Sequence, residues 1–116
     1  MQIKIQARDF LMTHAIREHI ERRLRYALSS CYRHIKRIMV RLSDINGPRS
    51  GDKRCHIEVI VPGQTLVVED TKSDLYSAVN SASSRAGRSV GRWLRRRRDI
   101  KCIQAPAKRL LLEHNP

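Results

Sequence analysis

Apolar residues recur at every second position along four stretches of the chain, residues 2–7, 34–45, 53–61 and 65–70. Alternation with a period of two places successive side chains on opposite faces of a strand, so each stretch is predicted to form a strand with one buried face. The buried faces are predicted to consist of Ile3 and Ile5; Ile38, Val40 and Leu42; Cys55, Ile57, Val59 and Val61; and Leu66 and Val68.

Two longer stretches repeat their apolar residues at every third or fourth position, which is the spacing of an amphipathic helix. The first helix is predicted over residues 14–31, with Thr13 as its N-cap. The second begins after an N-cap at Ser73 or Asp74, and Trp93 on its apolar stripe is expected to close the core where the helix leaves the sheet. The two stripes consist of Ile16, Ile20, Leu24 and Ala27 or Leu28, and of Leu75, Val79, Ala82, Ala86, Val90, Trp93 and Leu94.

The predicted elements follow the order β-α-β-β-β-α. A helix between the first two strands favours a parallel pair, whereas short turns between the later strands favour antiparallel pairs. We therefore expect an α+β fold, a four-stranded mixed sheet with two helices packed on one face, because this arrangement buries every apolar stripe once. The chain of 116 residues has the length of one domain, which we assign to residues 1–99. Residues 100–116 show little periodicity and are expected to form a mobile tail.

The strongly basic composition points to a polyanionic partner. The net charge of +13 destabilises an isolated compact fold by self-repulsion, and nucleic acid is the expected partner, ahead of an anionic membrane. Residues 85–98 contain seven arginines and no acid. A solvated helix end explains two or three arginines, whereas this density suits phosphate contacts. The predicted RNA-binding residues are Arg85, Arg88, Arg92, Arg95 and Arg96, which share one side of the second helix, and Arg22, Arg23 and Arg25 of the first helix.

Catalytic, metal-binding and membrane roles find little support in the chain. Three cysteines, an odd number, argue against a disulfide framework and favour free thiols in the cytoplasm. Cys31-x-x-His34 and Cys55-His56 lack the paired C-x-x-C spacing of a structural zinc site. No apolar run approaches the ~20 residues of a membrane span, and no P-loop, G-x-S-x-G or H-E-x-x-H motif occurs. We expect no enzyme activity, metal, cofactor, small-molecule substrate or membrane partner.

Two common RNA-binding architectures fit the sequence poorly. The strand predicted at residues 53–61 has no aromatic residue, so a sheet that stacks bases is not expected. A double-stranded-RNA-binding domain shares the β-β-β-α end of the order, but that family places its lysines at the start of the last helix. Here that start reads "SDLYSAVN", and the basic residues lie at the other end of the helix.

Two stretches of the chain carry motifs of a known family. "DLYSAVN" (residues 74–80) is similar to a D-L/M-Y-x-A-I-D signature, and it opens a helix that becomes basic. "MQIKIQARDFLMTHAIREHIERRLRYAL" is similar to an opening strand followed by T-x-x-h-R-x-x-h, where h is apolar. In these motifs and in the element order, about residues 1–98 resemble the ribosome hibernation promoting factors, also called ribosomal subunit interface or sigma-54 modulation proteins.

The resemblance implies a non-enzymatic protein that binds the small ribosomal subunit in the channel used by mRNA and tRNA. It would contact ribosomal RNA there and silence translation under stress or in stationary phase. The chain lacks the length for the second domain of long members, so it resembles the short form, and we expect a monomer when it is free. It departs from the family at Asn80, where an aspartate is usual, in the arginine content of the last helix, and in the long basic loop "NGPRSGDKR".

Two other functions remain open at this point. One is a general binder of structured RNA, and the other is a protein-interaction regulator such as a sigma-factor modulator. The sequence is compatible with a factor that promotes ribosome dimers and with one that holds single ribosomes inactive.

Overall fold

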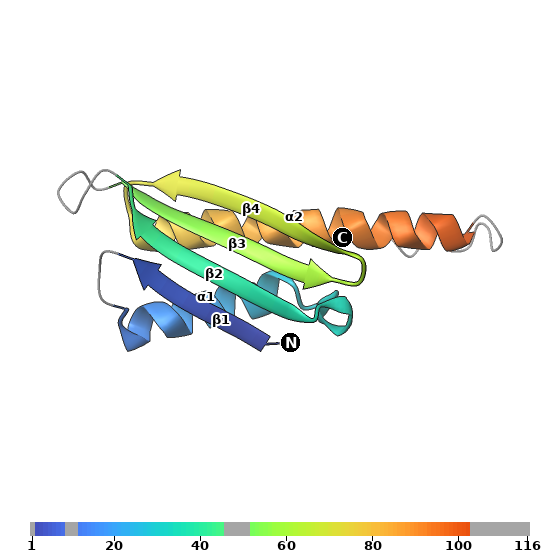
Figure 1. Ribbon diagram of the computed structural model, residues 1–116, viewed down its shortest axis with the longest axis horizontal. Coiled ribbons are helices and arrows are strands. Elements are labelled where there is room, and N and C mark those ends of the chain that lie inside the picture. The colour runs from blue at the N-terminus through green and yellow to red at the C-terminus, as the bar shows by residue number, and fades with distance from the viewer. Residues whose placement is uncertain (1, 9–11, 46–51, 103–116) are drawn as a thin grey trace.

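The computed structural model describes residues 2–8, 12–45 and 52–102, with side chains to Arg97. The element order is the predicted one, β-α-β-β-β-α, with one short 3₁₀ turn added (Figure 1). The elements are β1 (Gln2–Arg8), α1 (His14–Ala27), η1 (Tyr32–His34), β2 (Arg37–Asp44), β3 (Lys53–Val61), β4 (Gln64–Lys72) and α2 (Leu75–Cys102). Residues 46–51 of the predicted loop at 46–52 and residues 103–116 of the predicted tail lie outside the described residues.

The four strands form one mixed sheet in the order β1-β2-β3-β4. β1 pairs with β2 in parallel, and the other two pairs are antiparallel, as expected. Both helices cover the same face, behind the sheet in Figure 1. Gly63 has a φ of 85° in the tight turn between β3 and β4, a backbone conformation that favours glycine. The predicted α+β fold is therefore confirmed.

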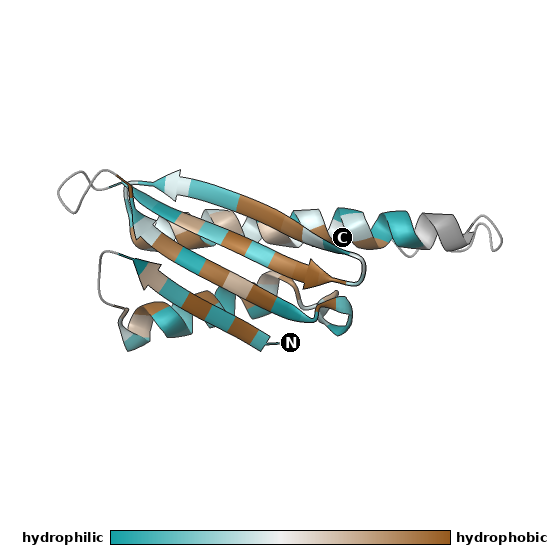
Figure 2. Cartoon of the chain, in the orientation of Figure 1, coloured by the Kyte–Doolittle hydropathy of each residue, from teal (hydrophilic) through white to brown (hydrophobic). Residues whose placement is uncertain are grey.

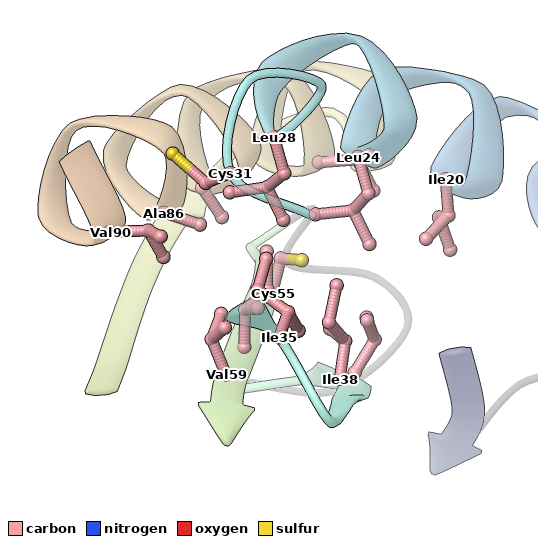
Figure 3. Packing of buried hydrophobic residues seen from close by; sticks show 14 of the residues in the cluster. Ile20, Leu24, Leu28, Cys31, Ile35, Ile38, Cys55, Val59, Ala86 and Val90 are labelled. Carbon is pink, nitrogen blue, oxygen red and sulfur yellow. The ribbon is translucent and has the colours of Figure 1, made fainter. Parts of the chain in front are cut away.

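The core lies between the sheet and the two helices. Apolar residues recur along the strands (Figure 2), and those at every second position of β2 and β3 are buried. Ile20, Leu24 and Leu28 point from the α1 region toward Ile38 and the neighbouring side chains of the sheet (Figure 3). Ile3 and Ile5 of β1 and Leu66 and Val68 of β4 pack against this core but stay partly exposed. Most of the fully buried side chains of the sheet therefore belong to the inner strands, β2 and β3.

The first helix is shorter than predicted. It ends at Ala27, and the Leu28 N–H still donates to the carbonyl of Leu24, at 2.9 Å, while its own backbone leaves the helical region. The apolar spacing continues past this end because Leu28, Cys31 and Ile35 are all buried in a non-helical connection. Spacing alone therefore predicted a helix one turn too long.

The start of each helix agrees with the predicted caps. Thr13 Oγ1 accepts a hydrogen bond from the Ile16 N–H at 3.2 Å, and Asp74 Oδ2 accepts one from the Ser77 N–H at 3.0 Å. Of the two caps predicted for α2, Asp74 is therefore the one used. The helix continues to Cys102, three residues beyond the predicted domain boundary at residue 99.

The two helices approach each other closely at Gly87. A β-carbon built there would lie 2.9 Å from the carbonyl oxygen of Ala27 and 3.3 Å from its β-carbon. Real β-carbons do not come that close to a backbone oxygen, so only glycine permits this distance between α1 and α2. A glycine inside a helix lowers helix stability by about 1 kcal/mol relative to alanine. The close contact with Ala27 explains why glycine is nevertheless found at position 87.

We expect Gly87→Ala to lower the free energy of unfolding by about 1–3 kcal/mol, because the added β-carbon overpacks the helix contact. The matched change Gly91→Ala places a β-carbon near Arg95 Nη1 alone, at 3.7 Å. It should raise the free energy of unfolding by about 0.5–1 kcal/mol through helix propensity. Urea denaturation of both variants measures the difference, and equal stability of the two would contradict the close contact.

Candidate nucleic-acid interface

All five arginines predicted on α2 are exposed to solvent. Their side of the helix lies opposite the buried stripe that includes Val79, Ala86 and Val90. Figure 1 also shows the last turns of α2 extending beyond the turn between β3 and β4. The arginines are thus presented by a helix that the sheet holds in place, which leaves their guanidinium groups available to a partner.

A groove of about 420 Å³ runs between α1 and α2. Four of the eight predicted RNA-binding residues meet there. We call this site the interhelical groove, and it is lined by Arg23, Tyr26, Ala27, Ser84, Gly87, Arg88, Gly91, Arg92 and Arg95. Two of the lining residues, Gly87 and Ala27, are where the helices pack most closely. The remaining predicted residues, Arg22, Arg25, Arg85 and Arg96, are exposed but do not line the groove.

Arg85 pairs with an acid of a neighbouring strand. Its Nε lies 3.2 Å from Asp70 Oδ2 of β4, and Ser81 Oγ donates to the same carboxylate. Hydrogen bonds from Ser81 and from the Thr71 backbone, together with Lys72 and Arg85, hold the pKa of Asp70 below its ordinary value. Asp70 therefore stays ionised and orients Arg85 toward β4, away from the groove. Although residues 85–98 contain no acid, Arg85 thus has a carboxylate partner on β4.

Tyr26 is an aromatic residue of the groove that sequence reasoning missed. Its side chain is 76% exposed, and the guanidinium carbon of Arg23 lies 5.8 Å from the centre of its ring. A large exposed aromatic ring beside several arginines is the arrangement on which nucleic-acid bases stack. The signal that could have revealed it is an aromatic residue on the polar side of an amphipathic helix.

Comparisons with known proteins identify the family of the chain. Residues 3–98 match the family model of the sigma 54 modulation protein / S30EA ribosomal protein family. The chain belongs to this family. No curated protein sequence matches the chain.

Two solved structures with the same fold are similar to the chain. The N-terminal domain of Protein Y from Thermus thermophilus is 30% identical, with a TM-score of 0.68, and the match covers 80% of this chain and 99% of that one. A ribosomal subunit interface protein from Coxiella burnetii is 19% identical, with a TM-score of 0.71, and the match covers 80% of this chain and 97% of that one. At that lower identity the second likeness shows the fold alone.

Asn80, the position at which this chain departs from the usual family motif, joins the two helices. His19 Nε2 of α1 and Asn80 Oδ1 of α2 lie 2.7 Å apart. The His19 ring also packs edge-on against Tyr76, with 4.8 Å between the ring centres. The substitution is thus accommodated in a polar contact that holds the helices together, at the opposite end of α2 from the basic residues.

Trp93 closes the core, as predicted, since it is only 7% exposed. The guanidinium carbon of Arg97 lies 4.9 Å from the centre of its ring. Arg97, which is only partly exposed, therefore covers Trp93 in a cation–π contact. Trp93 is not available to stack on RNA in this arrangement.

The two described thiols, Cys31 and Cys55, are buried. Burial, with a smaller contribution from the charge of Asp70, raises the pKa of Cys55 from an ordinary 9.0 to about 12. Over the described part of the chain, no cluster of three histidine, cysteine or acidic residues could hold a metal ion. Nor does any helix there combine the length and apolar character needed to cross a bilayer.

We expect iodoacetamide to alkylate Cys55 about 1000-fold more slowly at pH 8 in the folded protein than in urea, because a pKa of about 12 instead of 9.0 lowers the thiolate fraction by that factor. Residue-resolved mass spectrometry measures the rate. Because only the unfolded thiol ionises just above pH 9, the free energy of unfolding should also decrease there. Rapid labelling of Cys55 in the folded protein would contradict its burial.

Proposed function

We propose that this protein binds the small ribosomal subunit in the cytoplasm and inhibits translation under stress or in stationary phase by occupying the channel of mRNA and tRNA. The interhelical groove, with four arginines and one exposed tyrosine, is the observation that carries the proposal. Membership of the sigma 54 modulation protein / S30EA ribosomal protein family supports a ribosomal partner.

The chemistry of the groove suits an RNA backbone. Arg88, Arg92 and Arg95 project from successive turns of α2, and Arg23 faces them from α1. Guanidinium groups form paired hydrogen bonds with phosphate oxygens, so a row of them can follow consecutive phosphates. Such contacts position a protein on RNA by shape and charge, with little dependence on base sequence. Contacts of this kind, without recognition of base sequence, are sufficient for a protein that blocks a channel lined by RNA.

Tyr26 adds a contact of another kind. A base that leaves its stack in structured RNA can lie against an exposed aromatic ring, and such a contact is worth about 1–3 kcal/mol. The neighbouring Arg23 supports the ring from one side and carries a charge that attracts the adjoining phosphate. The groove therefore favours RNA in which an unpaired base lies beside a continuous backbone.

We expect Arg92→Gln/Arg95→Gln to weaken binding to isolated small subunits by about 10- to 100-fold. The slope of log K against log salt concentration should become shallower by about 1.4–1.8, since each lost phosphate contact removes about 0.7–0.9. The comparison variant Arg22→Gln/Arg25→Gln loses the same charge outside the groove and should change both quantities less. Sedimentation of labelled protein with subunits at several salt concentrations measures both.

The same assay separates the competing functions. Prior binding of mRNA and initiator tRNA to the subunit should exclude the protein, because all three occupy one space. Displacement by excess bulk tRNA would instead indicate a general binder of structured RNA. Unchanged activity of Arg92→Glu/Arg96→Glu would contradict both RNA-based functions and favour a protein-interaction regulator.

We expect Tyr26→Ala to reduce subunit affinity by about 5- to 50-fold, because the stacking surface is lost. Tyr26→Phe keeps the ring and should bind as the unchanged protein does. Tyr32→Ala is the matched control, since Tyr32 is 52% exposed but lies in η1 and does not line the groove. Equal losses for Tyr26→Ala and Tyr32→Ala would contradict a stacking role for Tyr26.

A further inference from the structure

A second cleft lies on the opposite face of the sheet from the helices. We call it the sheet cleft; its volume is about 610 Å³, and its polar lining consists of Gln6, Arg8, Arg41, Ser43, Arg54, His56 and Glu69. Each of these residues alternates along its strand with the residues that face the core. Because side chains alternate between the faces of a strand, the cleft opens on the face that no helix covers (Figure 1).

Three arginines gather in the sheet cleft around one serine. The strand register pairs Ser43 with Arg8 on one side and with Arg54 on the other, and Arg41 lies two residues before Ser43 on the same face. Among the described residues no ion pair engages Arg8 or Arg41. The Nε of Arg54 is buried without a hydrogen-bond partner, which is costly for a donor and would be relieved by an anion at its guanidinium group.

Two acids on the same face of the sheet as the arginines contact one histidine. His56 Nδ1 lies 3.0 Å from Glu69 Oε2, and His56 Nε2 lies 3.1 Å from Glu58 Oε2. The hydrogen bond with His56, aided by the charge of Arg54, holds the pKa of Glu69 below its ordinary value. Both carboxylates are therefore directed to His56 and do not neutralise Arg8 and Arg41, which leaves an excess of positive charge in the cleft.

We propose that the sheet cleft binds the phosphate backbone of a second RNA segment while the interhelical groove binds the first. This inference rests on the proposed function, which supplies an RNA-walled partner. Arginines and polar side chains without an exposed aromatic residue suit phosphate better than a base, and the cleft offers three guanidinium groups around a hydroxyl. With cationic surfaces on both sides of the sheet, one molecule holds two RNA segments on opposite sides of its fold.

The test compares two charge-matched variants of the full chain. Arg8→Gln/Arg41→Gln removes one charge from β1 and one from β2 inside the cleft. Lys4→Gln/Arg37→Gln removes one charge from each of the same strands on the same face but outside the cleft. All four side chains are exposed, so both variants should keep the thermal unfolding midpoint of the unchanged protein.

For isolated small subunits, the cleft variant should bind about 10-fold or more weakly, with a salt slope shallower by about 1.4–1.8. The control variant should bind within about 2-fold of the unchanged protein, because distant surface charges are screened. The difference between the pairs should persist with protein-free ribosomal RNA of the small subunit. A difference seen with subunits and lost with that RNA would assign the cleft to an acidic protein and overturn the inference.

The remaining outcomes separate the inference from the proposed function. If the unchanged protein binds subunits and the two variants behave alike, the sheet cleft is not a phosphate site, and the proposed function stands. If the unchanged protein does not bind subunits at all, the proposed function itself fails, and the inference fails with it.

Discussion

The contact between Gly87 and the backbone of Ala27 is the constraint on which the rest of the structure depends. Two helices that cover one face of a four-stranded sheet must lie side by side, and here they approach until a β-carbon no longer fits between them. The contact brings α1 and α2 together over the buried core, and both residues also line the interhelical groove. Fold stability and the shape of the candidate interface are therefore set by the same pair of residues.

The distribution of charge follows from this arrangement. Arginines that line one groove repel one another, and the buried aliphatic core must hold them against that repulsion. Asp70, the acid that pairs with an arginine of α2, is held by Ser81 and Arg85, and on the other face of the sheet Glu69 is held by His56. The positive surface that remains is a stable feature of the fold in the absence of a partner, and a polyanion that binds it relieves the repulsion.

The spacing of apolar residues predicted nearly all of the fold, because a strand or helix that buries one face has apolar residues at regular intervals along the sequence. The prediction from spacing failed after α1, because Leu28 and Cys31 are buried although the helix has already ended. The site was harder to predict. A helical wheel shows that Arg85 and Arg92 are exposed, but it does not show that Arg85 faces β4 or that Tyr26 faces α2, since both facts depend on the neighbouring elements.

An inhibitor that acts by occupying a channel depends on the rigidity of its fold and needs no catalytic group. In the proposed function no bond is made or broken, and the free energy of binding comes from phosphate contacts that act only if the arginines keep their relative positions. An exposed charge run on a flexible segment would lose that arrangement to conformational entropy. Arg88, Arg92 and Arg95 are instead held by a helix whose other side is buried as far as Trp93 and Leu94. The length of α2 that the sheet supports therefore determines how many arginines can act together.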